Sequence, residues 1–304
     1  MQNYIDLLKD ISENGVDKSD RTGVGTRAVF GRSMRWDLSD GFPIITTRKV
    51  AFRIAFEETM FFLRGESDTT KLEEKKIKIW SGNTTREFLD NRGLINLPVG
   101  DMGRGYGVQW RDWRTTEVLS AADTVTLKDG SEMGYGAKVR TKSTDQLVEL
   151  IEGLKRDPNG RRHIITAWNP GELNLMALPP CHITHQYIVN NGRLDSSWLQ
   201  RSVDSVFGLP YNIMSYAFMN VAFAKLLGLE PGELVFFGND VHIYNNQLRM
   251  ASEQITRSPR PLPKLTITKP LNTLDDLLSL EFSDVVIEGY DPHPDFKDKP
   301  PMAV

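Results

Sequence analysis

The stretch LPPCHITHQYIVNNGRLDSSWLQRSVD, residues 178 to 204, predicts a β-hairpin that organises the fold. Asn191 and Gly192 supply the two residues of positive φ that a two-residue turn of the primed type requires. Pro179 and Pro180 precede the first strand and hold the chain extended, because proline has a fixed φ and no amide donor. We therefore expect two antiparallel strands, the first of which begins at a constrained angle.

The register of this hairpin places a cation beside Cys181. Counting outward from the turn pairs Asn190 with Arg193. Further out, the same count places Cys181 opposite Ser202, on one face of the sheet. One β-bulge would place Arg201 opposite the cysteine instead. In either register a guanidinium lies near the sulfur, and we expect it to lower the pKa of the thiol and favour the nucleophilic thiolate.

Cys181 is the only cysteine in 304 residues, so it cannot form an internal disulfide. Three roles remain: an inert buried residue, a metal ligand or a nucleophile. His182, His185 and His242 could join it in a zinc site. However, His182 points to the opposite face of the strand, and Cys181 and His185 are ~13 Å apart along an extended strand. The spacing therefore argues against a metal, and we predict none.

Composition and charge are those of an ordinary globular chain. Hydrophobic residues make up 39% and charged residues 25%, the formal net charge is −3 and the sequence pI is about 6.0. This charge disfavours nucleic-acid binding through a general basic field. The N-terminal residues lack a signal-peptide pattern, and no stretch approaches the ~18 consecutive apolar residues of a membrane span. We predict a cytoplasmic protein, and a single cysteine fits a reducing compartment.

The order of expected elements predicts an α+β fold with a mixed or antiparallel sheet and a buried helix. No repeat or linker divides residues 1 to 304, so we expect one domain, with a surface insertion at about 115–142 that contains its own hairpin. Helical spacing is found at 4–11, at 49–63 before Gly65, after a capping box at Ser143 to Gln146, and at 213–227. Further strands are expected at 26–36, 234–237, 264–268 and 284–288.

Glu58 is a carboxylate on an otherwise apolar helical face, beside Ile54 and Phe62. One interpretation is that it points outward beside Glu57, because buried carboxylates are uncommon without a partner. The other is a desolvated carboxyl group with a raised pKa, which would suit it to proton transfer. The sequence leaves both open.

Four arginines lie in loop-like or strand-end contexts near glycines and hydroxyls: Arg21, Arg161, Arg162 and Arg201. Each could be a solvated surface charge. Together they also have the composition of a phosphate clamp, because guanidinium forks match phosphate oxygens. Neither a Walker motif nor a dinucleotide-binding glycine pattern is found in the sequence. A phosphate bound here would therefore belong to a mononucleotide-sized ligand.

Short motifs spread over nearly the whole chain resemble the thymidylate synthase family. They are DRTGVGT (20–26), FFLRG (61–65), KIW (78–80), YGVQWR (106–111), LPPCH (178–182), QRSVD (200–204), GLPYNI (208–213), FGNDVHIYNN (237–246) and EGYDPHP (288–294). The resemblance implies transfer of one carbon from 5,10-methylenetetrahydrofolate to C5 of dUMP, with no metal. It also implies a homodimer that forms through the sheet.

The resemblance assigns catalytic roles to residues that match the family motifs. Cys181 would add to C6 of the pyrimidine as the thiolate, with Arg201 beside it. Glu58, through ordered water, would move protons at the pyrimidine O4 and at the folate. Asn212 would hydrogen-bond N3–H and O4, which selects uracil over cytosine. Tyr106 resembles the active-site tyrosine of the family.

Binding roles follow from the same motifs. The 5′-phosphate would be held by Arg21, Arg201 and Ser202, joined by Arg161 and Arg162 from the other subunit. The sugar 3′-hydroxyl would be held by His242 and Tyr244. The folate site would be lined by Ile79, Trp80, Asn83, Asp204, Gly208, Tyr211 and Val304, with Asp204 also near the nucleotide. The C-terminal MAV would close over this site.

The chain departs from the family pattern at three places that the motifs put near the folate. Arg104-Gly105 replaces the usual Pro-Val before Tyr106, Ser81 replaces an acidic residue, and 115–142 has no close counterpart in short members. Related enzymes capture the same intermediate with water and make 5-hydroxymethyl-dUMP, so that product is an alternative. Trp80 and the MAV tail favour the methyl product.

A second alternative is a non-catalytic nucleotide- or RNA-binding homologue, since a fold alone does not establish activity. Cys181, Glu58 and Asn212 are all retained, and a binding module needs no thiolate.

Overall fold

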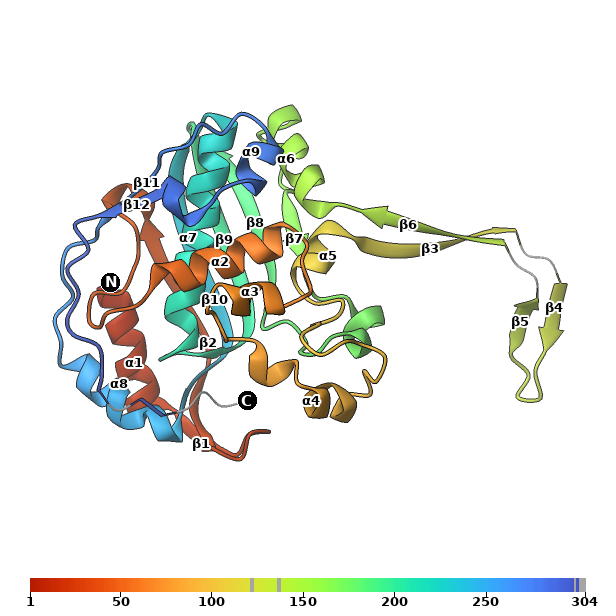
Figure 1. Ribbon diagram of the computed structural model, residues 1–304, viewed down its shortest axis with the longest axis horizontal. Helices are drawn as coiled ribbons and strands as arrows, with labels where there is room; N and C mark the ends of the chain where they lie inside the picture. Colours follow the sequence, from red (N-terminus) through yellow and green to blue (C-terminus); the bar gives the residue numbers. More distant parts are fainter. Residues whose placement is uncertain (121–122, 136–137, 298, 301–304) are drawn as a thin grey trace.

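A mixed six-stranded sheet forms the centre of the protein (Figure 1). The computed structural model describes residues 1–304 except 121–122, 136–137, 298 and 301–304. In sheet order the strands are β1 (Val16–Lys18), β2 (Thr26–Asp37), β10 (Glu230–Tyr244), β9 (Arg193–Asp204), β8 (His182–Asn190) and β7 (Ile164–Thr166). β9 and β10 are parallel, and the other neighbours are antiparallel. The predicted mixed sheet in a single α+β domain is confirmed.

The predicted hairpin is formed by β8 and β9. Asn191 and Gly192 have φ of 50° and 78°, as a primed turn requires. The register shifts between His182 and Thr184, and the amide of Arg201 donates to the Cys181 carbonyl over 2.9 Å. The uninterrupted pairing of Cys181 with Ser202 is therefore wrong, and the alternative with one bulge is confirmed.

The bulged residue of β8 is bonded to the segment on the other side of the strand. Ile183 is the extra residue, and its carbonyl accepts from the amide of Ala167 and the hydroxyl of Thr166. Ile183 therefore has no partner in the β9 register but is hydrogen-bonded on the β7 side.

Helices pack on the sheet and around the cavity described below. The α-helices are α1 (Gln2–Asn14), α2 (Phe52–Leu63), α3 (Thr70–Glu74), α4 (Arg86–Asn91), α5 (Gly107–Arg111), α6 (Gln146–Arg156), α7 (Gly208–Leu227), α8 (Leu248–Ile255) and α9 (Leu274–Leu278). Short 3₁₀ turns are η1 (Leu38–Asp40), η2 (Ser81–Asn83), η3 (Pro170–Leu175), η4 (Asn245–Gln247) and η5 (Phe282–Asp284). In the described residues, no helix has the length and apolar character that a membrane crossing would need.

The core lies where α7 and α2 pack together over the sheet (Figure 1). α7 is buried on nearly all sides, as its apolar sequence predicts. Phe56 of α2 meets Phe218 of α7 edge-to-face at 5.1 Å, a favourable aromatic geometry. α2 ends at Leu63 and Gly65 follows with φ of 73°, a left-handed conformation that glycine adopts without a Cβ clash.

Two sequence-based boundaries are wrong. The N-cap of α6 is Asp145, whose carboxylate accepts from the amides of Leu147 and Val148, because Ser143 belongs to a strand and donates to Asp112 instead. The strand expected at 234–237 extends over all of β10, since its backbone pairs with β2 on one side and β9 on the other. Polar residues interrupt the apolar pattern of β10, so the hydrophobicity of the sequence predicts only its central part.

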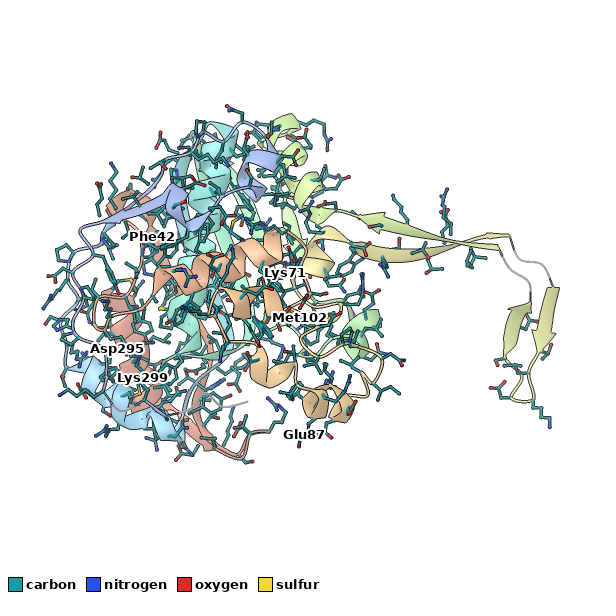
Figure 2. All side chains as sticks on the ribbon, viewed as in Figure 1. Phe42, Lys71, Glu87, Met102, Asp295 and Lys299 are labelled. Atoms are coloured by element: carbon teal, nitrogen blue, oxygen red, sulfur yellow. The ribbon has the colours of Figure 1, made fainter. Side chains whose placement is uncertain are left out.

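The described residues between Trp113 and Thr144 leave the body as a narrow projection (Figure 1). β3 (Trp113–Ser120) pairs antiparallel with β6 (Lys138–Thr144), and β4 (Asp123–Thr126) pairs with β5 (Glu132–Tyr135) further out. Side chains cover the body, and the projection extends away from it (Figure 2). We call β3 and β6 together the ribbon.

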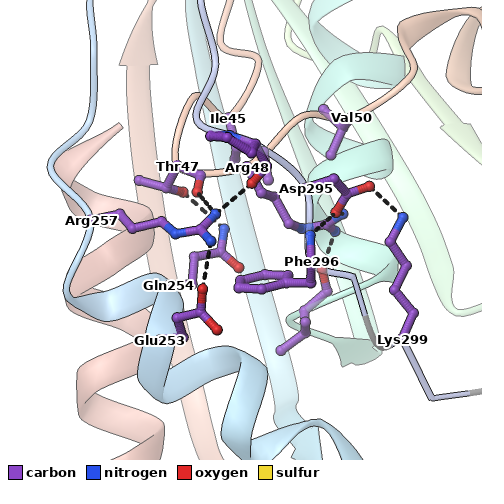
Figure 3. Close-up of polar contacts among 12 residues, drawn as sticks. Ile45, Thr47, Arg48, Val50, Glu253, Gln254, Arg257, Asp295, Phe296 and Lys299 are labelled. Atoms are coloured by element: carbon purple, nitrogen blue, oxygen red, sulfur yellow. Dashed lines mark hydrogen bonds and ion pairs between the residues drawn. The ribbon is translucent and has the colours of Figure 1, made fainter.

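The chain ends by wrapping along the surface after β11 (Lys264–Ile267) and β12 (Val285–Glu288), which pair antiparallel. The guanidinium of Arg257 donates to the carbonyls of Thr47 and Pro294 and lies 4.5 Å from the ring centre of Phe296 (Figure 3).

Asp295 gives the same segment a second anchor. It lies 3.8 Å from the buried guanidinium of Arg48 and also pairs with Lys299 (Figure 3). These contacts hold Pro294, Asp295 and Phe296 against the body. Val304, assigned to the folate site, lies outside the described residues.

Candidate active site

A cavity of about 840 Å³ opens beside Cys181, between the loop after β1, the η2–α4 region and the ends of β9 and β10. Of the residues predicted for the site, those that line it are Arg21, Trp80, Tyr106, Cys181, Arg201, Ser202, His242 and Tyr244. Other lining residues are Lys18, Ser19, Asp20, Thr22, Thr26, Phe88, Asn91, Arg92, Leu178, Pro179 and Asp240. The volume lies in the upper part of the range of small-molecule sites.

Arg201 is held rigidly next to the thiol. Its Nε donates to the Pro180 carbonyl and one Nη to the Pro179 carbonyl, each over 2.9 Å. The same Nη lies 3.7 Å from Cys181 Sγ, and the guanidinium lies over the Trp168 ring at 5.6 Å. The carbonyls of the two prolines therefore orient the guanidinium of Arg201. The sequence predicted only that the prolines constrain the start of the strand.

The expected net lowering of the thiol pKa is wrong. Burial raises the pKa of Cys181 above its usual range, and the charges of Arg201 and Arg21 and the Tyr106 hydroxyl only partly oppose this. Burial dominates because the thiolate loses its hydration. The group is therefore mainly a thiol at neutral pH, and Arg201 limits the cost of forming the anion.

Tyr106 contacts the backbone of Cys181 through its hydroxyl. Its ring stacks on Phe62 at 4.8 Å and lies 4.4 Å from the ring of His182, and its hydroxyl accepts from the Cys181 amide over 2.8 Å. Its backbone has φ of 31° and ψ of −99°, a strained conformation for a residue with a Cβ. Gly107 follows because a Cβ there would lie 2.3 Å from the Phe62 carbonyl oxygen.

Glu58 points into the protein toward Trp80, whose Nε1 donates to its carboxylate over 2.9 Å. Burial raises the pKa of Glu58 to about 7, and the bond from Trp80 opposes this only partly. Glu57, next to it, pairs instead with Lys75 over 2.7 Å. The interpretation that Glu58 points outward is excluded, and its carboxyl group can accept or donate a proton near neutral pH.

The amide orientation of Asn212 follows from a chain of hydrogen bonds that begins at Trp198. Indole N–H can only donate, so Gln200 must accept it through Oε1, over 3.0 Å. Gln200 then donates from Nε2 to Asn212 Oδ1 over 3.0 Å. Asn212 lies on the first turns of α7, partly exposed, and is not among the residues that line the cavity. Gln200 was missed, although it belongs to the QRSVD motif.

His242 is oriented by a carboxylate on the same strand. Its Nδ1 lies 2.8 Å from Asp240 Oδ1, and this bond is the main reason that the pKa of Asp240 is lowered. The ionised carboxylate can only accept, so Nδ1 donates this bond and Nε2 is the ring nitrogen left for another partner. Nε2 is buried and has no partner in the described residues. Partial burial raises the pKa of Tyr244, its neighbour, to about 12.

Only two of the four predicted phosphate-binding arginines line the cavity of this chain. Arg21 lies on a loop that Asp20 organises by accepting from the amides of Thr22 and Gly25, and it reaches the same cavity as Arg201. Arg161 and Arg162 are exposed and precede β7, at the opposite edge of the sheet from β1. Arg162 borders a separate cavity of about 270 Å³.

The predicted folate residues have varied surroundings. Trp80 lines the cavity, while Ile79, Gly208 and Tyr211 are partly exposed. The side-chain nitrogen of Asn83 is buried without a partner in the described residues. Asp204 already accepts from the amides of Val206 and Phe207 and from Gln247 Nε2, so its carboxylate holds the start of α7.

The side chains that depart from the family motifs bind other residues of the protein. Ser81 donates to Glu73, and Arg104 pairs with Asp112 and Glu172. None of these residues lines the cavity. Ser81 and Arg104 therefore make contacts within the protein and leave the cavity surface to other residues.

The histidines near Cys181 belong to the core. Nδ1 of His182 bonds the Tyr216 hydroxyl and Nδ1 of His185 bonds the Tyr187 hydroxyl. Burial lowers the pKa of both histidines to about 3, so both are neutral. Across the described part of the chain, no group of three or more His, Cys, Asp or Glu residues is placed to hold a metal ion.

The mixed sheet and the cavity beside Cys181 define a single-domain α+β protein with a cavity of the size that small molecules occupy. A family profile described as thymidylate synthase matches residues 2–304. "Thymidylate synthase" of Equine herpesvirus 2 (strain 86/87) is 40% identical over 290 residues, 95% of this chain and 94% of that protein. "Thymidylate synthase 1/2" of Encephalitozoon cuniculi (strain GB-M1) is 40% identical over 295 residues, 97% and 95% of the two chains. The chain therefore belongs to the thymidylate synthase family, and it is a methyltransferase.

Proposed function

We propose that this enzyme transfers one carbon from 5,10-methylenetetrahydrofolate to C5 of dUMP and reduces it, giving dTMP and dihydrofolate. The observation that carries the proposal is the enclosure of Cys181, beside the fixed guanidinium of Arg201, in a cavity that Arg21 also lines. A thiol and a phosphate-binding pair in one cavity fit a nucleotide whose base must be attacked.

The chemistry divides between the thiol and Glu58. The Cys181 thiolate adds to C6 of the pyrimidine, and the electrons of the C5–C6 double bond make C5 a carbon nucleophile for the one-carbon unit. Loss of the C5 proton breaks the bond between the one-carbon unit and the folate nitrogen and releases tetrahydrofolate. Hydride transfer from tetrahydrofolate to that carbon then gives the methyl group and dihydrofolate, and the thiolate leaves C6. Glu58, with a pKa of about 7, suits the proton movements at O4 and the folate. A reduced thiol agrees with a cytoplasmic location.

The folate would lie against the Trp80 side of the cavity. Trp80 lines the cavity, and Asn83, three residues further on, has a buried side-chain nitrogen with no partner in the described residues. The nucleotide sugar would reach the free Nε2 of His242.

The products formed from dUMP and methylenetetrahydrofolate test this function. We expect dTMP and dihydrofolate in equal amounts, separated by chromatography. If 5-hydroxymethyl-dUMP and tetrahydrofolate are the main products, water captures the intermediate and the hydroxymethylase alternative is correct. No conversion of dUMP with active folate would favour a binding protein.

Asn212→Asp is expected to shift the preference of the enzyme from dUMP toward dCMP. The fixed amide of Asn212 can accept from N3–H and donate to O4, whereas a protonated carboxyl can donate to N3 of cytosine and accept from its amino group. A mismatched hydrogen bond in a desolvated site costs ~1 to 3 kcal/mol, or about 5- to 150-fold. The measurement is kcat/KM for both nucleotides, and an unchanged ratio would exclude Asn212 as the base-reading residue.

We infer that two chains form a homodimer through the open face of the sheet. Phe30, Ile164 and Phe237 come from three of its strands and are 76%, 47% and 47% exposed. Large apolar groups gathered on one sheet favour burial against a second copy. Arg161 and Arg162, exposed at one end of this sheet, could then reach the phosphate in the partner's cavity.

Mixed dimers test the shared site. A subunit with Arg161→Ala and Arg162→Ala is exchanged with a Cys181→Ser subunit, and each homodimer alone is expected to be nearly inactive at low dUMP. A mixed dimer has one site that lacks all three groups and one intact site, so statistical exchange should restore about a quarter of wild-type activity. Failure to recover activity after subunit exchange is verified by mass spectrometry would show that each site uses one chain.

A further inference from the structure

The side chain of Arg104 is the centre of a largely buried ionic cluster outside the cavity. Its Nε donates to Glu172 over 2.9 Å, and its two Nη groups donate to the carboxylate and the carbonyl of Asp112 over 2.8 and 2.6 Å. Gln109, which is fully buried, donates to both Glu172 and the Arg104 carbonyl. The Arg104 and Glu172 side chains are only 13% and 17% exposed. Solvent therefore screens this cluster much less than a surface ion pair.

The two segments that Arg104 and Glu172 join both lead to the reacting sulfur. The backbone amide of Arg104 donates to the Leu175 carbonyl over 2.9 Å, so a backbone hydrogen bond also joins the two segments. Beyond that point one segment continues to Tyr106 and the other to Cys181. They meet again where the Cys181 amide donates to the Tyr106 hydroxyl over 2.8 Å.

Tyr106 needs this support because its backbone is strained. A non-glycine residue at φ of 31° and ψ of −99° keeps that conformation only when its surroundings determine it strongly. We propose that Arg104 is a positioning residue, which, held between Glu172 and Asp112, fixes the Tyr106 hydroxyl beneath the amide of Cys181. This inference rests on the proposed function, in which Cys181 is the nucleophile.

The same cluster connects the ribbon to the active site. The Asp112 carboxylate that binds Arg104 also accepts from Arg114 Nε over 2.8 Å and from the Ser143 hydroxyl over 2.5 Å. Arg114 belongs to β3 and Ser143 to β6. Each strand of the ribbon therefore has a residue bonded to the Asp112 carboxylate, which also binds Arg104. Arg104, a departure from the family motif, and the ribbon, another departure, thus share one ion-pair network.

A double-mutant cycle between Arg104→Met and Tyr106→Phe tests the proposal. Arg104→Met alone is expected to lower kcat about 10- to 100-fold, as a misplaced reacting group does, with a change of less than about threefold in KM for dUMP. It should also shift the pH dependence of Cys181 alkylation by iodoacetamide upward, measured by intact-protein mass spectrometry without turnover. In the Tyr106→Phe background, which lacks the hydroxyl, Arg104→Met should change kcat by less than about twofold. It should leave the pH dependence of Cys181 alkylation nearly unchanged.

Controls separate positioning from general stability. Arg111→Met removes a similarly covered arginine of α5 that binds Asp145 and the Leu63 carbonyl, and should lower the Tm without shifting alkylation. Arg104→Lys should recover part of kcat, because lysine keeps the charge but cannot bridge both carboxylates. Glu172→Gln preserves shape and serves if Arg104→Met does not fold; it should move both readouts in the same direction.

Two outcomes would overturn the proposal: equal effects of Arg104→Met with and without the Tyr106 hydroxyl, or normal alkylation and kcat in both Arg104→Met and Glu172→Gln. Neither outcome would affect the assignment of Cys181. The reverse also holds, because a catalytically active Cys181→Ser enzyme would reject the proposed function whatever Arg104 does.

Discussion

Cys181→Ser is expected to lower kcat by on the order of 10⁴-fold or more while the Kd for dUMP changes less than about threefold. Serine has nearly the same shape but a hydroxyl that ionises far less readily than a thiol, so addition to C6 is lost. The phosphate contacts proposed for Arg21 and Arg201 do not involve the sulfur, and Arg201 stays fixed by the Pro179 and Pro180 carbonyls. Single-turnover rates and equilibrium binding of dUMP measure the two effects.

A covalent trap provides the control for this prediction. With 5-fluoro-dUMP and methylenetetrahydrofolate, the wild-type enzyme should form a stable adduct on Cys181, because fluorine at C5 cannot leave as a cation. Intact-protein mass spectrometry should detect it in the wild type and not in Cys181→Ser. Turnover by Cys181→Ser above about a hundredth of the wild-type rate would contradict the nucleophile assignment.

Glu58→Gln should reduce activity and increase stability. A positioned proton-transfer group contributes typically 10²- to 10⁴-fold, so kcat should fall within that range. Glutamine can still accept from Trp80 Nε1, so the site should keep its shape. The remaining activity should also lose the pH dependence that a group with pKa of about 7 gives the wild type. The pH profile of kcat measures this.

The stability gain follows from proton linkage. The pKa of Glu58 is about 4.5 in the unfolded chain and about 7 in the folded one, so between these values the folded protein binds more protons. The stability of the wild type therefore falls as pH rises from 4.5 to 7, by up to about 3 kcal/mol, and stays lower above that range. Glutamine does not ionise, so Glu58→Gln should be the more stable protein at pH 8 and about equal to the wild type near pH 4.5.

The neighbouring carboxylate is the matched control. Glu57 is buried but paired with Lys75, so Glu57→Gln should lower stability at pH 8 and leave kcat nearly unchanged. Chemical denaturation at several pH values compares the three proteins. If Glu58→Gln is less stable than the wild type at pH 8, the carboxyl group is not desolvated and its raised pKa is wrong.

Charge partners were the least predictable part of the site. The sequence places Arg201 close to Cys181, yet burial of the thiol outweighs the guanidinium, so the expected direction of the pKa was wrong. Arg104 stood out as a motif departure, but its partners Asp112 and Glu172 come from different segments. Desolvation and long-range pairing depend on how the whole chain packs, and residue spacing does not report either.

Local geometry, by contrast, is set by the sequence itself. The Asn191-Gly192 turn, the end of α2 before Gly65 and the all-apolar α7 depend on backbone sterics and on short-range hydrophobic pattern, and these are the same in any fold. The motifs also determined the family. Tertiary structure alone decided the bulge at Ile183, the parallel pairing of β9 with β10 and the inward direction of Glu58. Each of these depends on contacts between distant segments, whose free energy exists only once the core has formed.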